Sequence, residues 1–456
     1  MRLSEATLAR LPANIARFSY DRTAQKLGIV HFGIGAFHRA HQAWYTDLAM
    51  DAGECDWAIA GVSLRSGTVA SQLKPQDGLY SLTERGGGAN ATRVIRSVRG
   101  VWVADAAAPA VQARVAAPGT HLVTITVTEK GYCRAPDGTL DLAQARGNTL
   151  YRHLAGAILA RRRAATAGLT LLSCDNLPGN GELLRALLAQ YLEAEAPAGL
   201  DWFLSECACP NSMVDRIVPA ATEADLAAAE RTLGLRDEGA VFAERFSQWV
   251  IEDRFAGPRP GWEKVGAQLV CDVAPYETAK LRMLNGAHSA LAYCGLERGH
   301  EFVHQAIADP PLRALVERVM RHEAAPSFSA APGQDLEGYA DALLARFADP
   351  ALNHRLAQIA MDGSQKIPPR WLETLAFHQH RGTSCLALLE ALAAWLRHVR
   401  GDRRPVDDPL AATLAELWAS AGAAGIAAAL FGPHGLFARN WQADEPALAA
   451  LAGKLG

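Results

Sequence analysis

A lysine, an asparagine and a histidine recur at short spacing in the segment 276–288, in the order Lys280-x4-Asn285-x2-His288. The segment is predicted to be α-helical. At about 100° per residue, His288 falls about 80° and Asn285 about 140° from Lys280, so all three project over one side of the helix. A lysine whose pKa is lowered by burial can act as a base near neutral pH, and an amide can polarise an oxygen. The same spacing also fits a solvated lysine beside two capping or core polar side chains.

A second polar cluster, Ser-Cys-Asp-Asn-Leu-Pro-Gly-Asn-Gly at 173–181, follows an apolar run that reads as a buried strand. Open α/β sheets bind ligands at the carboxyl ends of their strands. The cluster is therefore a candidate site, although a plain polar loop fits it equally well.

Gly33-x-Gly35 marks a strand-to-helix junction, where glycines let the backbone approach a pyrophosphate. His38 stands where the usual motif has its third glycine. The acid that normally follows the second strand and selects NAD is absent from 61–68, and Arg65 instead suits a 2′-phosphate. The motif predicts dinucleotide binding, with the choice between NAD and NADP open.

The elements around these residues predict the fold class. Strands are expected at 28–33, 57–64, 121–128 and 169–174, with a helix at 36–50 and another around 161–163. Alternating strands and helices indicate a parallel sheet, whereas helical spacing of apolar residues dominates after Pro275. We therefore expect a dinucleotide-binding domain at 1–274 and an all-helical domain at 275–456.

Composition narrows the class of protein. With 456 residues the chain predicts two domains, and its net charge of −3 gives no reason to expect nucleic acid or a membrane surface as partner. The eight cysteines are scattered without a zinc-site spacing, which favours buried free thiols in a reducing compartment. The uncharged stretch 417–438 is interrupted by glycines and Pro433, so a packed helix and a loop are expected. The N-terminus lacks the apolar core of a signal peptide, and a cytoplasmic protein is predicted.

Seven motifs together resemble one family, the polyol-specific long-chain dehydrogenases, which include mannitol dehydrogenases and fructuronate reductases. They lie at 29–42, 128–132, 173–181, 210–217, 249–253, 280–288 and 362–366. The resemblance runs from end to end. It implies a Rossmann-type N-terminal domain, a helical C-terminal domain and metal-free hydride transfer in a cleft between them, by a monomer acting on a small sugar-derived molecule.

The resemblance also implies residue roles. Lys280 matches the general acid/base, Asn176 and Asn285 the amides that hold the reacting oxygen, His288 a substrate-orienting residue, and Glu277 a carboxylate that assists proton movement. Matched substrate-side positions are Val214, Asp215, Gln358 and Lys366. Expected cofactor-binding residues are Ile29, Val30, His31, Phe32, Gly33, Ile34, Gly35, Ala36, Phe37, His38, Arg39, Ala40 and Arg65.

Two departures bear on substrate and cofactor. The family's NAD-selecting acid is missing near Gly67 and Thr68, and an arginine that contacts the polyol in some mannitol enzymes is replaced by Gln358. The segment 362–370 is more similar to fructuronate reductases, and the N-terminal third to mannitol dehydrogenases. The basic residues Lys366, Arg370 and Arg381 slightly favour D-fructuronate and D-mannonate over D-fructose and D-mannitol, because one of them can bind a carboxylate. A structural salt-bridge role fits these residues equally well. An inactive nucleotide-binding sensor is the distant alternative.

Overall fold

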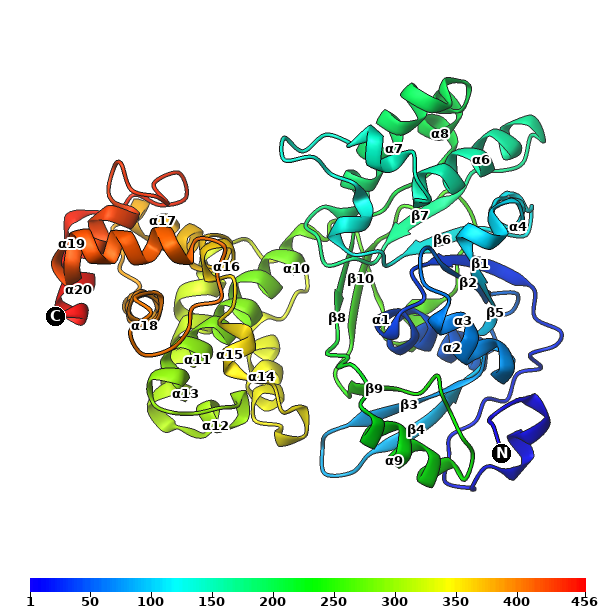
Figure 1. Cartoon of the computed structure of the whole chain (residues 1–456), viewed down its shortest axis with the longest axis horizontal. Coiled ribbons are helices and arrows are strands. Elements are labelled where there is room, and N and C mark those ends of the chain that lie inside the picture. The colour runs from blue at the N-terminus through cyan, green and yellow to red at the C-terminus, as the bar shows by residue number, and fades with distance from the viewer. The chain divides into compact units, whose positions relative to one another are not determined.

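The computed structural model describes residues 1–105, 107–351 and 353–456. The chain forms two compact units, Met1–Val273 and Ala274–Gly456 (Figure 1). The N-terminal unit is α/β and the C-terminal unit is helical, which confirms the predicted fold class.

The N-terminal unit is built on a five-stranded parallel sheet. Its strand order is β5 (Val98–Val103), β2 (Ala58–Ser63), β1 (Leu27–Phe32), β6 (Leu122–Ile125) and β7 (Thr170–Ser173). The chain pairs β1 first with β2 and later, on the opposite edge, with β6, so the strand order reverses at β1. The carboxyl ends of β1 and β6 therefore form the crevice where such sheets bind ligands.

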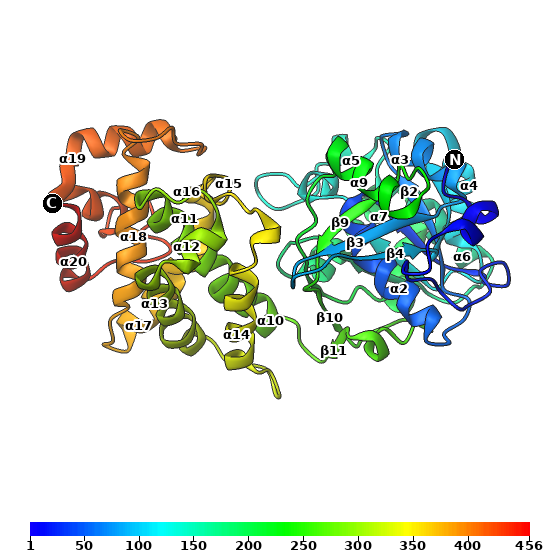
Figure 2. The same ribbon diagram turned by 90° about the horizontal axis from the view of Figure 1, so that it is seen from below.

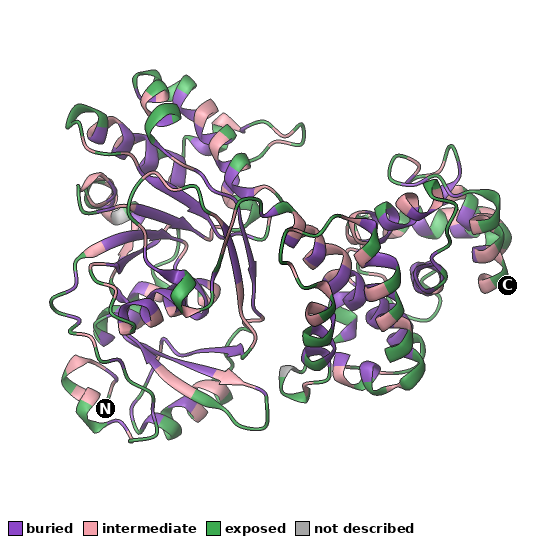
Figure 3. Ribbon diagram, turned by 180° about the vertical axis from the view of Figure 1, so that it is seen from behind, coloured by how far each residue is buried: buried purple, intermediate pink, exposed green. Residues whose placement is uncertain are grey.

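Helices cover both faces of this sheet, and the strands are accordingly buried along their lengths (Figure 3). Val30 and Phe32 pack toward α4 (Ala104–Ala116), α6 (Leu150–Arg163) and α7 (Asn180–Glu195). Ile29, which points the other way, packs toward the face covered by α1 (Ala36–Ala40) and α2 (Gln42–Asp51). Nearly continuous apolar strands are the consequence of burial on both faces.

Two smaller three-stranded sheets, which the sequence did not predict, complete the unit. One has the order β11 (Gln268–Val270), β10 (Gln248–Glu252), β8 (Ser212–Asp215), and the other β4 (Ala91–Ile95), β3 (Tyr80–Arg85), β9 (Val241–Glu244). Its further helices are α3 (Thr68–Leu73), α5 (Leu142–Ala145), α8 (Leu200–Glu206) and α9 (Glu223–Leu233).

The helix predicted at 36–50 is two helices, α1 and α2, separated at His41, whose φ of −125° and ψ of −88° are not helical. The His41 ring is buried and meets the Gln248 carbonyl at 3.0 Å and the Gln42 amide at 2.9 Å. These partners hold the ring toward β10, so the prediction of one continuous helix was wrong.

The C-terminal unit has no β-strand in its described residues (Figure 2). The helix at its centre is α11 (Gly286–Glu297), whose residues from Gly286 to Leu296 are all buried. Around it lie α12 (Val303–Ala308), α13 (Pro310–Arg318), α14 (Leu336–Phe347), α15 (Leu356–Ile359), α16 (Gly363–Ile367), α17 (Glu373–His380), α18 (Leu386–Val399), α19 (Ala411–Phe431) and α20 (Glu445–Leu455). Three π-helical turns, η6 (Lys280–Asn285), η7 (Val319–Ala324) and η10 (Pro368–Leu372), interrupt the α-helices.

The uncharged stretch near the C-terminus lies largely in α19, the one described helix whose length and apolar composition would suffice to cross a membrane. Gly422, with φ of +62° and ψ of −175°, breaks it into two shorter helices. Each half is shorter than the about 20 residues that a span requires. The structure therefore has two short helices and a loop where the sequence predicted one packed helix and a loop.

Candidate active site

The glycine-rich turn follows β1 at the carboxyl edge of the parallel sheet. Gly33 has φ of +98°, and a Cβ at this position would lie 1.9 Å from the Thr126 carbonyl oxygen. Gly35 precedes α1 in an ordinary extended conformation, and a Cβ there would meet nothing closer than the Gly33 oxygen at 3.8 Å. Gly33 therefore permits the turn itself, whereas the missing side chain of Gly35 leaves open space beside the exposed backbone.

His31 and His38 support this turn from beneath. Both are fully buried, and their rings stack with centroids 3.3 Å apart. His31 places its ring nitrogens 2.8 Å from Thr124 Oγ1 and 3.0 Å from Thr126 Oγ1. Burial lowers the pKa of His31 to about 3 and that of His38 well below its usual range, so both rings are neutral.

The expected cofactor-binding residues thus divide into two groups. Gly33, Gly35, Ala36 and Phe37 reach the surface of the turn. The others in this segment form its buried support: Ile29, Val30, His31, Phe32, Ile34, His38, Arg39 and Ala40. A dinucleotide fits this site, because an exposed glycine backbone lies where the strand order reverses.

Arg65 lies in the turn between β2 and α3 and is exposed. The neighbouring groups are hydroxyls: Ser63 Oγ donates to the Ser66 oxygen over 2.6 Å, and Ser66 Oγ donates to Thr68 Oγ1 over 2.8 Å. No described carboxylate forms an ion pair with Arg65. Hydroxyls and one cation, without the usual acid, surround the position expected for the adenosine ribose.

The loop after β7 presents Asn176 at the same sheet edge, and Asn176 is exposed. Its neighbour Asp175 is buried and accepts hydrogen bonds from the backbone N–H groups of Val127 (3.0 Å) and Thr128 (2.9 Å). Burial raises the pKa of Asp175, while these donors oppose the rise. Asp175 thereby ties the end of β7 to the end of β6 and fixes the backbone next to Asn176.

Asn180 braces the other end of this loop. Its side-chain amide donates to the carbonyls of Asp175 (2.9 Å) and Ser212 (2.8 Å), and its oxygen accepts from the Ser212 N–H (2.9 Å). Asp175 and Asn180 are positioning residues that the sequence did not single out by role. Their signal was present, since both belong to the polar cluster, but spacing alone does not separate a brace from an exposed donor.

Lys280 and Asn285 are the first and last residues of the π turn η6, between α10 (Ala274–Ala279) and α11. The segment is helical as predicted, but the assumption of α-helical angles throughout was wrong. A π turn contains one extra residue, so a spacing of five across it resembles a spacing of four in an α-helix. Lys280 to His288 then resembles a spacing of seven, and all three residues follow one line along the helix.

Two side chains from η10 contact the point where the π turn becomes α-helical. Arg370 Nη1 lies 3.4 Å from the Asn285 carbonyl oxygen and 2.8 Å from Ser289 Oγ. Trp371 Nε1 donates to the Gly286 carbonyl over 3.0 Å. These donors satisfy carbonyls at a break in the helical hydrogen-bond pattern, and so stabilise the turn that aligns Lys280 with Asn285.

His288 is 7% exposed, and its ring lies against Phe347 with centroids 4.6 Å apart. Burial, followed by the charges of His354, Arg346 and Arg370, lowers its pKa well below the usual range. The ring is therefore neutral, with one nitrogen able to donate and the other to accept a hydrogen bond.

The remaining predicted site residues lie on several elements. Val214 and Asp215 are buried on β8, opposite Trp249 and Gln248 of β10, and belong with Asn176 to the N-terminal unit. The residues of the C-terminal unit are half-buried Glu277 on α10, exposed Gln358 on α15 and half-buried Lys366 on α16. Lys366 Nζ donates to the Met361 carbonyl over 2.6 Å and lies 3.6 Å from the Asp362 carboxylate.

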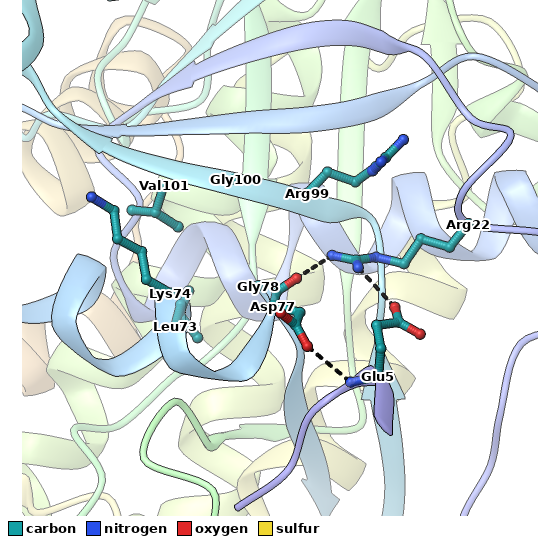
Figure 4. Close-up of a pocket in the computed structure, with 9 residues that line it drawn as sticks. All are labelled: Glu5, Arg22, Leu73, Lys74, Asp77, Gly78, Arg99, Gly100 and Val101. Carbon is teal, nitrogen blue, oxygen red and sulfur yellow. Dashed lines mark hydrogen bonds and ion pairs between the residues drawn. The ribbon is translucent and has the colours of Figure 1, made fainter. Parts of the chain in front are cut away.

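A cavity of about 410 Å³ lies elsewhere in the N-terminal unit, beside edge strand β5 (Figure 4). The Arg22 guanidinium points into it and pairs with Glu5 at 2.7 Å, and the Glu5 N–H donates to the Asp77 carboxylate over 3.1 Å. Its charged groups largely satisfy one another, which indicates a structural hollow. In the described chain no group of three or more His, Cys, Asp or Glu is placed to hold a metal ion.

A parallel sheet with a glycine turn at its reversal point, followed by a helical unit with an aligned Lys–Asn–His set, defines a Rossmann-type dehydrogenase. Two family models match this chain: the mannitol dehydrogenase Rossmann domain over residues 27–264, and the mannitol dehydrogenase C-terminal domain over residues 272–442. The chain belongs to the mannitol dehydrogenase family of oxidoreductases.

Named relatives agree with this assignment. The chain is 38% identical to D-mannonate oxidoreductase of Escherichia coli K12, over 93% of this chain and 91% of the relative. It is 37% identical to a mannitol 2-dehydrogenase of Pyrenophora tritici-repentis, over 90% and 76%. The ternary complex of Pseudomonas fluorescens mannitol 2-dehydrogenase with NAD and D-mannitol superposes with a TM-score of 0.82 at 33% identity, over 100% of this chain and 96% of that one.

Proposed function

We propose that this protein catalyses reversible hydride transfer between a nicotinamide dinucleotide and the ketone of a sugar acid, with D-fructuronate and D-mannonate as its substrate pair. The observation that carries the proposal is the alignment of Lys280, Asn285 and His288 by the π turn. An aligned amine, amide and neutral imidazole suit proton transfer at a secondary alcohol, and the family supplies the reaction class.

The chain's own residues have distinct roles in this proposal. In the oxidation direction Lys280, as a neutral amine, takes the hydroxyl proton. Asn285 donates a hydrogen bond to the developing alkoxide, and family resemblance assigns the same role to Asn176. His288 orients a neighbouring hydroxyl, and Glu277 assists proton movement near the lysine. Val214, Asp215, Gln358 and Lys366 are proposed to line the substrate.

The dinucleotide would be held at the turn around Gly33 and Gly35 and supplies the hydride acceptor when bound. NAD is the proposed cofactor, as in the Pseudomonas fluorescens complex. NADP is the alternative because Arg65 stands where an acid usually selects NAD. The proposal further includes a metal-independent monomer in the cytoplasm, in keeping with the eight free cysteines, and no nucleic-acid or membrane partner.

The preference for a sugar acid is supported by the basic residues Lys366, Arg370 and Arg381, and by the 38% identity to a D-mannonate oxidoreductase. The alternative pair is D-fructose and D-mannitol, which the similarly close mannitol 2-dehydrogenases favour. The test is the rate of NADH oxidation with D-fructuronate and with D-fructose. We expect a higher kcat/KM with fructuronate, and a tenfold preference for fructose would overturn the proposal.

A further inference from the structure

Arg370 in η10 is a guanidinium with an unused binding edge. Its Nη1 makes both of its hydrogen bonds, to Ser289 Oγ at 2.8 Å and to the Asn285 carbonyl at 3.4 Å. Nε and Nη2, which carry three further N–H groups, donate to no described residue. The Nε–Nη2 side of a guanidinium is one of the two edges that bind a carboxylate through paired hydrogen bonds.

The Arg370 guanidinium also has no carboxylate as an ion-pair partner among the described residues. Within the described chain it forms no ion pair, and the nearby Tyr293 phenol is neutral because burial raises its pKa. Burial lowers the pKa of the Arg370 guanidinium to about 10, so it remains charged at neutral pH. Buried charges in proteins are normally paired, because desolvation is costly without a counter-ion. Arg370 is half-buried, and a partly desolvated arginine that lacks a counter-ion is suited to bind an anion.

The groups nearest Arg370 add to its positive potential. Its charge helps to lower the pKa of both His288 and Lys366. The Asp362 carboxylate pairs instead with Lys366, at 3.6 Å. An anion bound to Arg370 would therefore lie close to the line formed by Lys280, Asn285 and His288.

Comparison with other basic residues of the same unit singles out Arg370. Lys366 is held by Asp362 and the Met361 carbonyl. Arg282 pairs with Glu373 at 2.7 Å. Arg381 is exposed and stacks over the Phe377 ring at 4.3 Å. Arg370 is half-buried, and it alone among these four combines partial burial, a free donor edge and no opposing charge.

We propose that Arg370 is the specificity-determining residue that binds the substrate carboxylate through its Nε–Nη2 edge while Nη1 stays on Ser289 and Asn285. This inference rests on the proposed function and names the residue that makes a sugar acid the preferred substrate. Fructuronate carries a carboxylate where fructose carries a primary alcohol, so the two substrates differ at the group that Arg370 would bind.

The test compares kcat/KM for D-fructuronate and D-fructose in the wild type, Arg370→Gln, Arg370→Lys and a control at an exposed arginine of the same unit, Arg403→Gln. Removing one partner of a buried charge pair is costly, so Arg370→Gln should lose about 10²-fold with fructuronate, chiefly through KM. Its loss with fructose should be at least about tenfold smaller, because fructose has no carboxylate and only the contacts of Nη1 with Ser289 and Asn285 are then lost. Arg370→Lys should lose about tenfold with fructuronate, because it keeps the charge but not the paired donors. Arg403→Gln should change neither value.

Equal losses with both substrates in Arg370→Gln would overturn the proposal, since they would identify Arg370 as a brace of the π turn only. An unchanged preference for fructuronate in that variant would also overturn it, while leaving the proposed function intact. If Arg370→Gln does not fold, as judged by its thermal unfolding, the ratio in Arg370→Lys decides. A wild type that prefers fructose would instead overturn the proposed function, and this inference with it.

Discussion

The glycine turn of the N-terminal unit and the π turn of the C-terminal unit both depart from regular backbone to form a site. Gly33 adopts φ of +98°, and the result is exposed backbone at a sheet edge. The turn Lys280–Asn285 adds one residue to a helix, and the result is a line of side chains. The glycine turn requires glycine and can be recognised in the sequence. The π turn requires no particular residue type, so the sequence does not reveal it.

The largest expected effect is the loss of turnover when Lys280 in the π turn is replaced. We expect Lys280→Ala to lower kcat by about 10²–10⁴-fold, because a positioned acid/base group contributes on that order. Affinity for the dinucleotide should stay nearly unchanged, since the residues that would hold it lie in the other unit. Steady-state kinetics together with cofactor titration checks this, and near-wild-type turnover would falsify the role of Lys280.

Substitution of the two glycines in the glycine turn, Gly33 and Gly35, should have different effects on stability and on dinucleotide binding. Gly33→Ala should lower the free energy of unfolding by about 3 kcal/mol, because a Cβ clashes with the Thr126 carbonyl and the conformation is strained. Gly35→Ala is its matched control and should change stability by less than about 0.5 kcal/mol. It should nevertheless raise the KM for the dinucleotide about tenfold, because the new methyl occupies open space where a pyrophosphate would approach. Similar stabilities for the two variants in urea unfolding would contradict this account of the turn.

A fall in pH should destabilise the protein at His31, which is buried beneath the glycine turn. The folded-state pKa of His31 is lowered to about 3, below its value of about 6.5 in the unfolded chain. Neutral His31 therefore contributes fully to the free energy of unfolding above about pH 6.5. This contribution is lost as the pH falls toward the folded-state pKa, because the unfolded chain takes up the proton first. Between pH 7 and pH 5, protonation of this histidine in the unfolded chain should lower the free energy of unfolding by about 2 kcal/mol. Urea unfolding of His31→Gln should show a pH dependence weaker by that amount, and equal slopes for variant and wild type would exclude the effect.

The smallest effect is expected at Arg65, on the preference between NADPH and NADH. Arg65→Gln should lower kcat/KM for NADPH relative to NADH by about tenfold, because it removes a cation from the expected position of the 2′-phosphate. Arg163→Gln, an exposed arginine on α6, serves as the control. A cofactor ratio that stays the same in Arg65→Gln would show that Arg65 does not contact the ribose end.

Much of the fold followed from local patterns. Apolar runs marked β1, β2, β6 and β7 because strands buried on both faces need continuous apolar residues. The strands of the two small sheets were missed because pairings such as that of β3 with β9 join segments far apart in the chain, although β3 is longer than β6. The break at His41 was missed because it depends on Gln248, a contact that no local pattern contains.

The local conformation around the candidate site residues could not be predicted from the sequence. α-Helical angles put Asn285 about 140° from Lys280. The π turn reduces that angle, and no residue type in the segment signals the turn. Arg370 was visible only as one of three basic residues, because its burial and its lack of a carboxylate arise from tertiary packing. Asp175 and Asn180 belonged to a recognised cluster, but their hydrogen bonds to β6 and β8 depend on tertiary structure.

The most direct test of the central claim is the pH dependence of alcohol oxidation, measured with a substrate deuterated at the reacting carbon so that hydride transfer limits the rate. We expect the rate of the wild type to rise with pH to a plateau as the Lys280 ammonium loses its proton, and this rise to disappear in Lys280→Ala. A flat profile for the wild type, with a full isotope effect at every pH, would contradict it.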